Sequence, residues 1–143
     1  MRLSIISLFG LTSIFINAQK LIHFGSVQKL SEKINSSSEE LMPLVSNDGK
    51  SFYFVRARHE ENVGGATAGH DIWSADFKGS DFDNVNNNFG KLNNVGNNAI
   101  VGINAENSKI YLLNAYQTES KLEKGVALTD DKFSKPTFVQ IDG

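Results

Sequence analysis

A pronounced β-hairpin signal at residues 41–56 constrains the fold of this chain more than any other feature. In "LMPLVSNDGKSFYFVR", two runs rich in apolar residues flank the turn at 47–50. The pair Asp48-Gly49 between such runs is among the strongest short-range hairpin signals, because glycine adopts a positive φ without a Cβ clash. The second arm is rich in aromatic and β-branched residues, which suit a half-buried pleated surface. A two-stranded hairpin needs further strands to be stable, so the sequence predicts a sheet.

A third strand is expected at "HDIWSADFKG", where Ile72, Trp73 and Phe77 lie between two glycines. The preceding stretch, "RHEENVGGATAG", is polar and rich in glycine, so it is expected to form a loop. "KLSEKINSSSEEL" is the only ambiguous stretch beyond Ala18, and its serines and asparagine disfavour a long helix.

The hairpin signal recurs further along the chain. When Leu41 is aligned with Ala99, "LMPLVSNDGKSFYFV" falls on "AIVGINAENSKIYLL", so that Gly49 meets Asn107. In the same alignment Tyr53 meets Tyr111. Asparagine is among the residues that best tolerate left-handed backbone geometry after glycine. Similar opening segments are found at three places: "FGSVQKL" at 24–30, "FGKLNNV" at 89–95 and "FSKPTFV" from residue 133.

Each repeat would hold about four short strands, which is the size of a propeller blade. The predicted fold class is all-β: an incomplete β-propeller of about two four-stranded antiparallel blades plus a blade-opening segment. Residues 1–18 are assigned to a signal peptide and 19–143 to the repeats. Blade one is expected at about 24–79, blade two at about 89–129, and the start of a third opening segment at 133–143.

The first repeat resembles the TolB-like β-propeller repeat. In that family a Glu-x-x-Pro precedes a Ser-Pro-Asp-Gly-Lys turn, an aromatic strand follows, and a Gly-x-Asp-Ile-aromatic motif closes the blade. Asn47 stands where the family has proline. The matching residues that form the structural motif are Glu40, Pro43, Asp48, Gly49, Tyr53, Asp71, Ile72 and Trp73, together with Ser46, Lys50, Phe54 and Gly69.

The second repeat is less similar to this family. It has no proline in its first strand and no Asp-Gly, and "KGVALTDD" stands where Asp-Ile-aromatic is expected. The resemblance implies a bacterial envelope setting. Proteins with this repeat include OmpA-family proteins with a downstream peptidoglycan-binding domain, and others in which the propeller is coupled to a peptidase.

Two blades cannot close a ring, because propellers close with four to eight blades and an open fan leaves sheet edges exposed. Three arrangements are open: the front part of a longer product, an assembly with other copies, or a small two-sheet stack. The sequence favours the first, since it stops just after an opening segment. Residues 19–143 alone are expected to be marginally stable and to self-associate, because an uncovered blade exposes an apolar patch.

Residues 1–18 follow the pattern of a secretory signal peptide. Arg2 gives a positive start, an apolar run follows at 3–16, and cleavage is expected between Ala18 and Gln19. This run is shorter than the roughly 20 apolar residues of a membrane span. The chain has no cysteine, which excludes lipid anchoring at the cleavage point. The expected location is therefore periplasmic or secreted, with no membrane span in the mature chain.

The composition excludes some classes of function. A formal net charge of −2 with 21% charged residues gives no basic footprint for nucleic acid. There is no Gly-x-Ser-x-Gly motif and no cysteine to act as a nucleophile. A Ser-His-Asp set is not excluded by spacing alone, because such triads assemble in space.

One loop region gathers residues that ligate metals in other proteins. Its spacing is not His-Glu-x-x-His, and a solvated loop at the blade edge is the favoured interpretation over a zinc site. The residues concerned are His59, Glu60, Glu61, His70 and Asp71.

"DFDNVNNNFG" at 81–90 imitates the start of a calcium loop. Asp81 and Asp83 occupy the first and third ligand positions, but Val85 falls where an oxygen ligand is needed. The asparagine-rich run is better interpreted as turn material. No metal or cofactor is predicted.

Five residues near the end of the second strand and the start of the third have expected roles. Asp71 is expected to fix its strand by accepting backbone N–H bonds rather than to act as a catalytic carboxylate, while Trp73 packs between adjacent blades. Arg56 and Arg58 are expected to alternate outward. With His59 they form the candidate binding surface for an anionic partner, the alternative being a solvated outer face.

The predicted function is that of an exported, non-enzymatic scaffold for protein or cell-wall interactions in the bacterial envelope. Its partner would be an envelope protein or a peptidoglycan-associated partner. The alternative is the propeller portion of a hydrolase, a peptidase or glycoside hydrolase, with catalytic residues outside this chain or at the blade tops. A glycosidase would need two carboxylates around a pocket.

Overall fold

The computed structural model describes residues 25–117 and 122–139; the predicted signal peptide at 1–18 lies outside the described residues. The described part is all-β, as predicted, and contains no helix of the length and hydrophobicity that a membrane span requires. Its strands are β1 Glu39–Val45, β2 Ser51–Ala57, β3 Asp71–Phe77, β4 Phe82–Asn86, β5 Asn98–Ile103, β6 Lys109–Gln117, β7 Leu122–Asp130 and β8 Thr137–Phe138.

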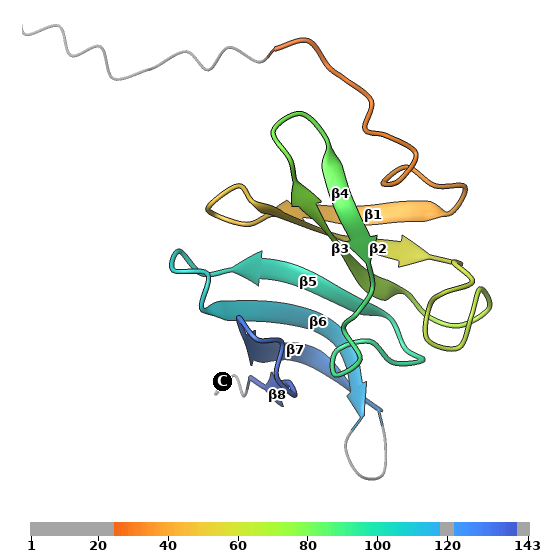
Figure 1. Ribbon diagram of the computed structural model, residues 1–143. Helices are drawn as coiled ribbons and strands as arrows, with labels where there is room; N and C mark the ends of the chain where they lie inside the picture. Colours follow the sequence, from red (N-terminus) through yellow and green to blue (C-terminus); the bar gives the residue numbers. More distant parts are fainter. Residues whose placement is uncertain (1–24, 118–121, 140–143) are drawn as a thin grey trace, which may run out of the picture.

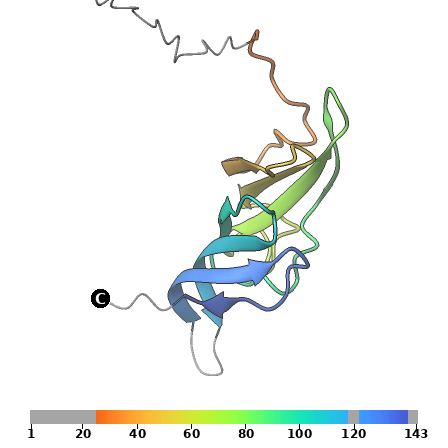
Figure 2. The ribbon, with the colours of Figure 1, turned by 90° about the vertical axis from the view of Figure 1, so that its left-hand side faces the viewer.

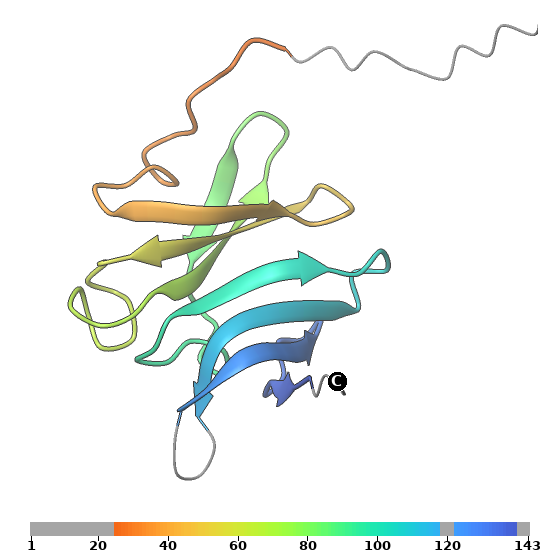
Figure 3. The same ribbon diagram turned by 180° about the vertical axis from the view of Figure 1, so that it is seen from behind.

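These strands form two antiparallel four-stranded sheets that lie next to one another (Figure 1). Sheet one has the order β1-β2-β3-β4 and sheet two the order β5-β6-β7-β8. Each strand pairs with its neighbour in sequence, so each sheet is a simple meander. The views from the side and from behind show β5 beside sheet one and β8 at the far end of sheet two (Figure 2 and Figure 3). The two sheets are not closed into a ring.

Strand pairing in the two sheets is equivalent when the two sequence repeats are aligned. Leu44 pairs with Tyr53 in sheet one, and Gly102 pairs with Tyr111 in sheet two. These two pairs occupy equivalent positions when the two repeats are aligned. A β-bulge interrupts the first strand of each sheet, just before Leu44 and just before Gly102. The sequence repeat is therefore also a repeat of backbone pairing.

The two hairpin turns are equivalent as well. Gly49 has a φ of 71° and Asn107 a φ of 55°. Each donates its backbone N–H over 2.9 Å to the carbonyl oxygen three residues earlier, that of Ser46 or Asn104. Residues that carry a side chain are strained at positive φ, and asparagine is among those that tolerate it best. The prediction that Asn107 takes the place of Gly49 in the second turn is confirmed.

The aromatic residues of two opening segments meet in the structure. The rings of Phe89 and Phe133 lie with their centroids 4.8 Å apart, edge to face. The residues after Phe133 supply β8, the fourth strand of sheet two. Sheet one extends to Asn86, beyond the expected limit of blade one near 79. The segment expected to open a third blade thus contributes its described part to sheet two.

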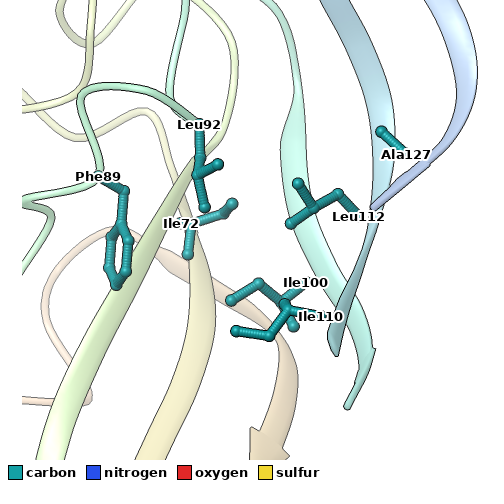
Figure 4. Close-up of a cluster of buried hydrophobic side chains, with 7 residues drawn as sticks. All are labelled: Ile72, Phe89, Leu92, Ile100, Ile110, Leu112 and Ala127. Atoms are coloured by element: carbon teal, nitrogen blue, oxygen red, sulfur yellow. The ribbon is translucent and has the colours of Figure 1, made fainter. Parts of the chain in front are cut away.

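The main hydrophobic core lies between the two sheets. Ile72 of β3 and Leu92, on the loop between the sheets, face Ile110 and Leu112 of β6, and none of these four side chains is more than 2% exposed (Figure 4). A second cluster covers the opposite side of sheet one. Its buried members are Ile34, Phe52, Phe54, Trp73 and Ala75.

The prediction that Trp73 packs between adjacent blades is wrong for the two sheets described. Successive side chains of a strand point to opposite faces, so Ile72 and Trp73 cannot both face sheet two. Ile72 is the residue in the core between the sheets. Trp73 packs against Phe54 on the other side of sheet one, with ring centroids 6.5 Å apart.

Backbone contacts between the loop before β3 and the segment that leads into β5 join the sheets. The N–H of Gly69 donates to the carbonyl oxygen of Val95 over 3.2 Å, and the N–H of Asn98 donates to that of His70 over 2.8 Å. A Cβ atom on Gly69 would overlap with the carbonyl group of Gly96. Glycine is required here because there is no room for a side chain.

We therefore predict that Gly69→Ala lowers the free energy of unfolding by about 1–3 kcal/mol, the usual cost of overpacking, because the two loops must separate. Urea denaturation measures the change. Gly90→Ala is the matched control, since a Cβ there meets no atom within 4 Å. Equal unfolding midpoints for the two variants would contradict the close contact.

Candidate functional site

The residues expected to bind a partner, Arg56, Arg58 and His59, lie at the end of β2 and just after it. An open groove of about 520 Å³ lies beside them on the face of sheet one that is turned away from sheet two. We call it the Trp73 groove. It is lined by Lys33, Arg56, His59, Glu60, Glu61, Trp73, Asp83, Asn84 and Val85.

Arg56 is buried, contrary to the prediction that it points outward. Only 4% of it is exposed. Its Nε donates to Glu40 Oε1 over 3.1 Å, and its Nη2 donates to the carbonyl oxygens of Lys33 and Ile34 over 2.9 and 3.1 Å. The guanidinium carbon lies 4.3 Å from the centre of the Trp73 ring, a cation–π contact. Arg56 therefore ties the segment before β1 to sheet one.

Trp73 forms the floor of the groove but is itself enclosed. Its Nε1 donates to Asn62 Oδ1 over 3.1 Å, and Asn62 in turn donates to the carbonyl oxygen of Arg56 over 2.8 Å. The half-buried ring of His59 meets the indole edge to face, with centroids 4.8 Å apart. With 3% of Trp73 exposed, a ligand in this groove would contact its rim rather than the indole.

The rim of the groove carries both signs of charge. Lys33 Nζ forms an ion pair with Asp83 over 3.0 Å, and the hydrogen bond from Lys33 is the main reason why the pKa of Asp83 is lowered. Arg58 lies just outside the groove, is exposed, and pairs with Glu39 over 3.2 Å. Of the two arginines, Arg58 is the one that points to solvent, as expected.

Asp71 is wholly buried at the start of β3. Its Oδ2 accepts the backbone N–H of Val63 over 2.8 Å, while its Oδ1 has no hydrogen-bond partner among the described residues. Burial raises the pKa of this carboxyl, and the bond from Val63 offsets the rise only in part. Asp71 thus accepts a backbone N–H, as expected. It is not accessible to a substrate in this structure.

Other residues of the structural motif shape the first hairpin. Asp48 accepts the Ser46 hydroxyl over 2.6 Å and the Lys50 N–H over 3.1 Å, and these bonds lower its pKa. Pro43 lies within the bulge of β1, where the register shifts. The half-buried Tyr53 packs against the core between the sheets.

The described residues contain no group of three or more His, Cys, Asp or Glu side chains arranged to hold a metal ion. In the stretch that imitates a calcium loop, Asp81 accepts the N–H of Phe82 and Asp83 pairs with Lys33. The asparagine-rich run at 84–88 is predicted to be turn material, but Asn84 and Asn86 belong to strand β4. Asn84 does have the positive φ, 52°, that favours asparagine.

A second groove, which sequence reasoning missed, lies between the two hairpin turns. It has a volume of about 220 Å³. Asn47 bridges the turns: its Nδ2 donates to the carbonyl oxygen of Asn104 over 2.6 Å, and its N–H donates to Asn107 Oδ1 over 3.2 Å. We call this second groove the turn groove. It is lined by Ser46, Asp48, Ser51, Tyr53, Ile103, Glu106, Asn107, Ile110 and Asp131.

Comparison with protein-family models, with curated proteins and with solved structures finds no match to this chain.

We predict that Arg56→Ala lowers the free energy of unfolding by about 3 kcal/mol or more, because it removes the buried cationic partner of Glu40 and the guanidinium donor to the carbonyl oxygens of Lys33 and Ile34. Arg58→Ala is the control, and loss of its exposed ion pair with Glu39 should cost less than about 1 kcal/mol. Chemical denaturation of both variants provides the test. A smaller loss for Arg56→Ala than for Arg58→Ala would refute the buried role.

We predict that Asp71 makes stability decrease as pH rises. The folded state holds the Asp71 proton more tightly than the unfolded state, so the contribution of Asp71 to stability is greatest below the ordinary aspartate pKa of 3.8 and falls as pH rises from there to the raised folded value. Asp71→Asn should remove this fall.

The measurement is the melting temperature between about pH 3 and pH 7, where carboxylates titrate. Asp83→Asn is the control. The pKa of Asp83 is lowered rather than raised, so its removal should leave the fall in place. Parallel pH profiles for wild type and Asp71→Asn would contradict the role of Asp71.

Proposed function

We propose that this protein is an exported, non-enzymatic interaction module of the bacterial cell envelope, built from two β-propeller-type blades. It binds a protein or a peptidoglycan-associated partner through the side of the molecule on which its hairpin turns meet. No cofactor is part of this proposal.

The observation that carries the proposal is the equivalence of the two turns. Gly49 and Asn107 occupy the same position in two sheets of the same register, and Asn47 holds the turns side by side. Repeated units that stack place equivalent loops on one surface, which repeat proteins use for binding. A meander of four strands repeated in this way is also the architecture of propeller blades.

The turn groove offers such a surface. Three of its lining residues, Asp48, Glu106 and Asp131, are carboxylates. All three are exposed, so a partner with basic groups can pair with them without first displacing buried structure. Asp71, another carboxylate of the resembled motif, lies outside the turn groove and is buried. Its burial argues against a catalytic role for Asp71.

We predict that the double substitution Glu106→Lys with Asp131→Lys weakens binding of the exported protein to its envelope partner at least about tenfold, since opposed charges then become like charges. Chemical cross-linking in intact cells, followed by fractionation, measures the yield of the adduct. Asp81→Lys is a matched control, because Asp81 is exposed and lies outside the turn groove.

Three results would overturn the proposal: retention of residue 1 in a cytoplasmic product, equal adduct yield for the double variant and the wild type, or release of soluble fragments from purified peptidoglycan by the protein alone. The last result would support the hydrolase alternative.

A further inference from the structure

The two sheets contact each other through non-equivalent faces, as the alignment of the two repeats shows. We call the face with Phe52 and Phe54 the front of sheet one. In the repeat alignment Phe52 and Phe54 correspond to Ile110 and Leu112. The face with Ile110 and Leu112 is therefore the front of sheet two. The front of sheet two faces sheet one. The contact is therefore rear of sheet one against front of sheet two.

The rear of sheet two is left uncovered among the described residues. Tyr111 and Leu113 on this face are 38% and 37% exposed. Leu113 pairs with Val126 as Val55 pairs with Ile72 in sheet one. Ile72 is fully buried against sheet two, whereas its equivalent Val126 is only half-buried. The rear of sheet two is thus equivalent to the rear of sheet one, which contacts sheet two, but it has no such cover among the described residues.

The front of sheet one keeps the features that receive a neighbour. At the internal contact, the N–H of Asn93 donates to the carbonyl oxygen of Phe89 over 2.7 Å, forming a turn that holds Leu92 in the core. Asn35 and Ser31 are the equivalents of Asn93 and Phe89 in the repeat alignment, and the N–H of Asn35 donates to the carbonyl oxygen of Ser31 over 2.9 Å. This earlier turn therefore has the same hydrogen bond as the turn that contacts sheet one.

The asparagine of the internal turn makes the contact itself. Asn93 Oδ1 accepts the N–H of Ile72 over 2.8 Å, and its Nδ2 donates to the carbonyl oxygen of Ile72 over 2.9 Å. The equivalent Asn35 is half-buried, and its Nδ2 donates to the carbonyl oxygen of Leu30 over 2.8 Å. Asn35 is thus placed as Asn93 is, but with no preceding sheet among the described residues.

A groove of about 220 Å³ with a mainly apolar lining lies beside Asn35. It includes Ile34, Phe52 and Phe54 of the front face. Val45, on the same face, is 52% exposed, whereas its repeat equivalent Ile103 is half-buried against the core between the sheets. The front of sheet one is therefore a receiving surface that lacks its neighbour.

We propose that a second copy of this chain fills this position, with the rear of its sheet two (Tyr111, Leu113 and Val126) docked on the front of sheet one (Ile34, Asn35 and Val45). Both halves of the contact are present on one chain, and the internal contact shows that such faces fit. The interface is heterologous, so it continues from copy to copy until a ring closes or a filament forms. The proposal depends on the repeat geometry and not on the binding function proposed above.

Sedimentation velocity of the purified protein over a series of concentrations tests this proposal. The wild type should sediment faster as concentration rises. Leu113→Lys on the rear face and Val45→Lys on the front face should each remain monomeric at concentrations at which the wild type associates. Val63→Lys is the matched control, because Val63 is a loop residue that is 39% exposed, and it should associate like the wild type.

Mixing the two variants distinguishes a head-to-tail contact from a symmetric one. The Leu113→Lys chain keeps an intact front and the Val45→Lys chain an intact rear, so the mixture should form a one-to-one dimer and nothing larger. Circular dichroism confirms that each variant is folded, and Tyr111→Glu replaces Leu113→Lys if the latter is not. A monomeric wild type, a self-associating single variant, or a mixture that stays monomeric would overturn the proposal.

Discussion

The arrangement of the two sheets depends on one side-chain amide, that of Asn93. Ile72 lies in the core between the sheets, at a position of β3 that β4 does not reach in its pairing. Its backbone N–H and carbonyl groups would be unpaired in an apolar environment, which is costly. The Asn93 amide pairs with both groups, as a strand residue would. Asn93 thus completes sheet one with a residue from the loop that leads to sheet two.

The front of sheet one is organised around a charged side chain, that of Arg56, in an aromatic environment. Arg56 is held by Glu40, by two backbone carbonyl groups and by the face of Trp73. A buried charge is tolerated only when it is paired and hydrogen-bonded, and here the N–H groups at both Nε and Nη2 have acceptors. This arrangement fixes the segment before β1, whose Ile34 covers the aromatic cluster.

The sequence was sufficient to predict the repeat, because turns and apolar alternation are local. It identified the hairpin at 47–50, the equivalence of Gly49 with Asn107, and the all-β class. The outward placement of Arg56 was wrong for a reason visible in the sequence: Phe52, Phe54 and Arg56 are spaced two apart and share a face. The burial of that face depends on the segment around Ile34, which contacts it from outside the sheet. The roles of the buried asparagines could not be predicted, since Asn93 and Asn62 act on residues distant in sequence and otherwise resemble the turn-forming asparagines around them.

The bulges in β1 and β5 have a consequence for the solubility of the protein. Both strands are edge strands, and a straight edge strand with free N–H and carbonyl groups is a template for uncontrolled pairing with other chains. At Met42 the backbone takes a φ of 52° and the register shifts, and Pro43 has no N–H to offer. β5 shifts its register at the equivalent place. The break in regular geometry therefore protects both edges against amyloid-like growth, while the faces of the sheets stay available for specific contacts.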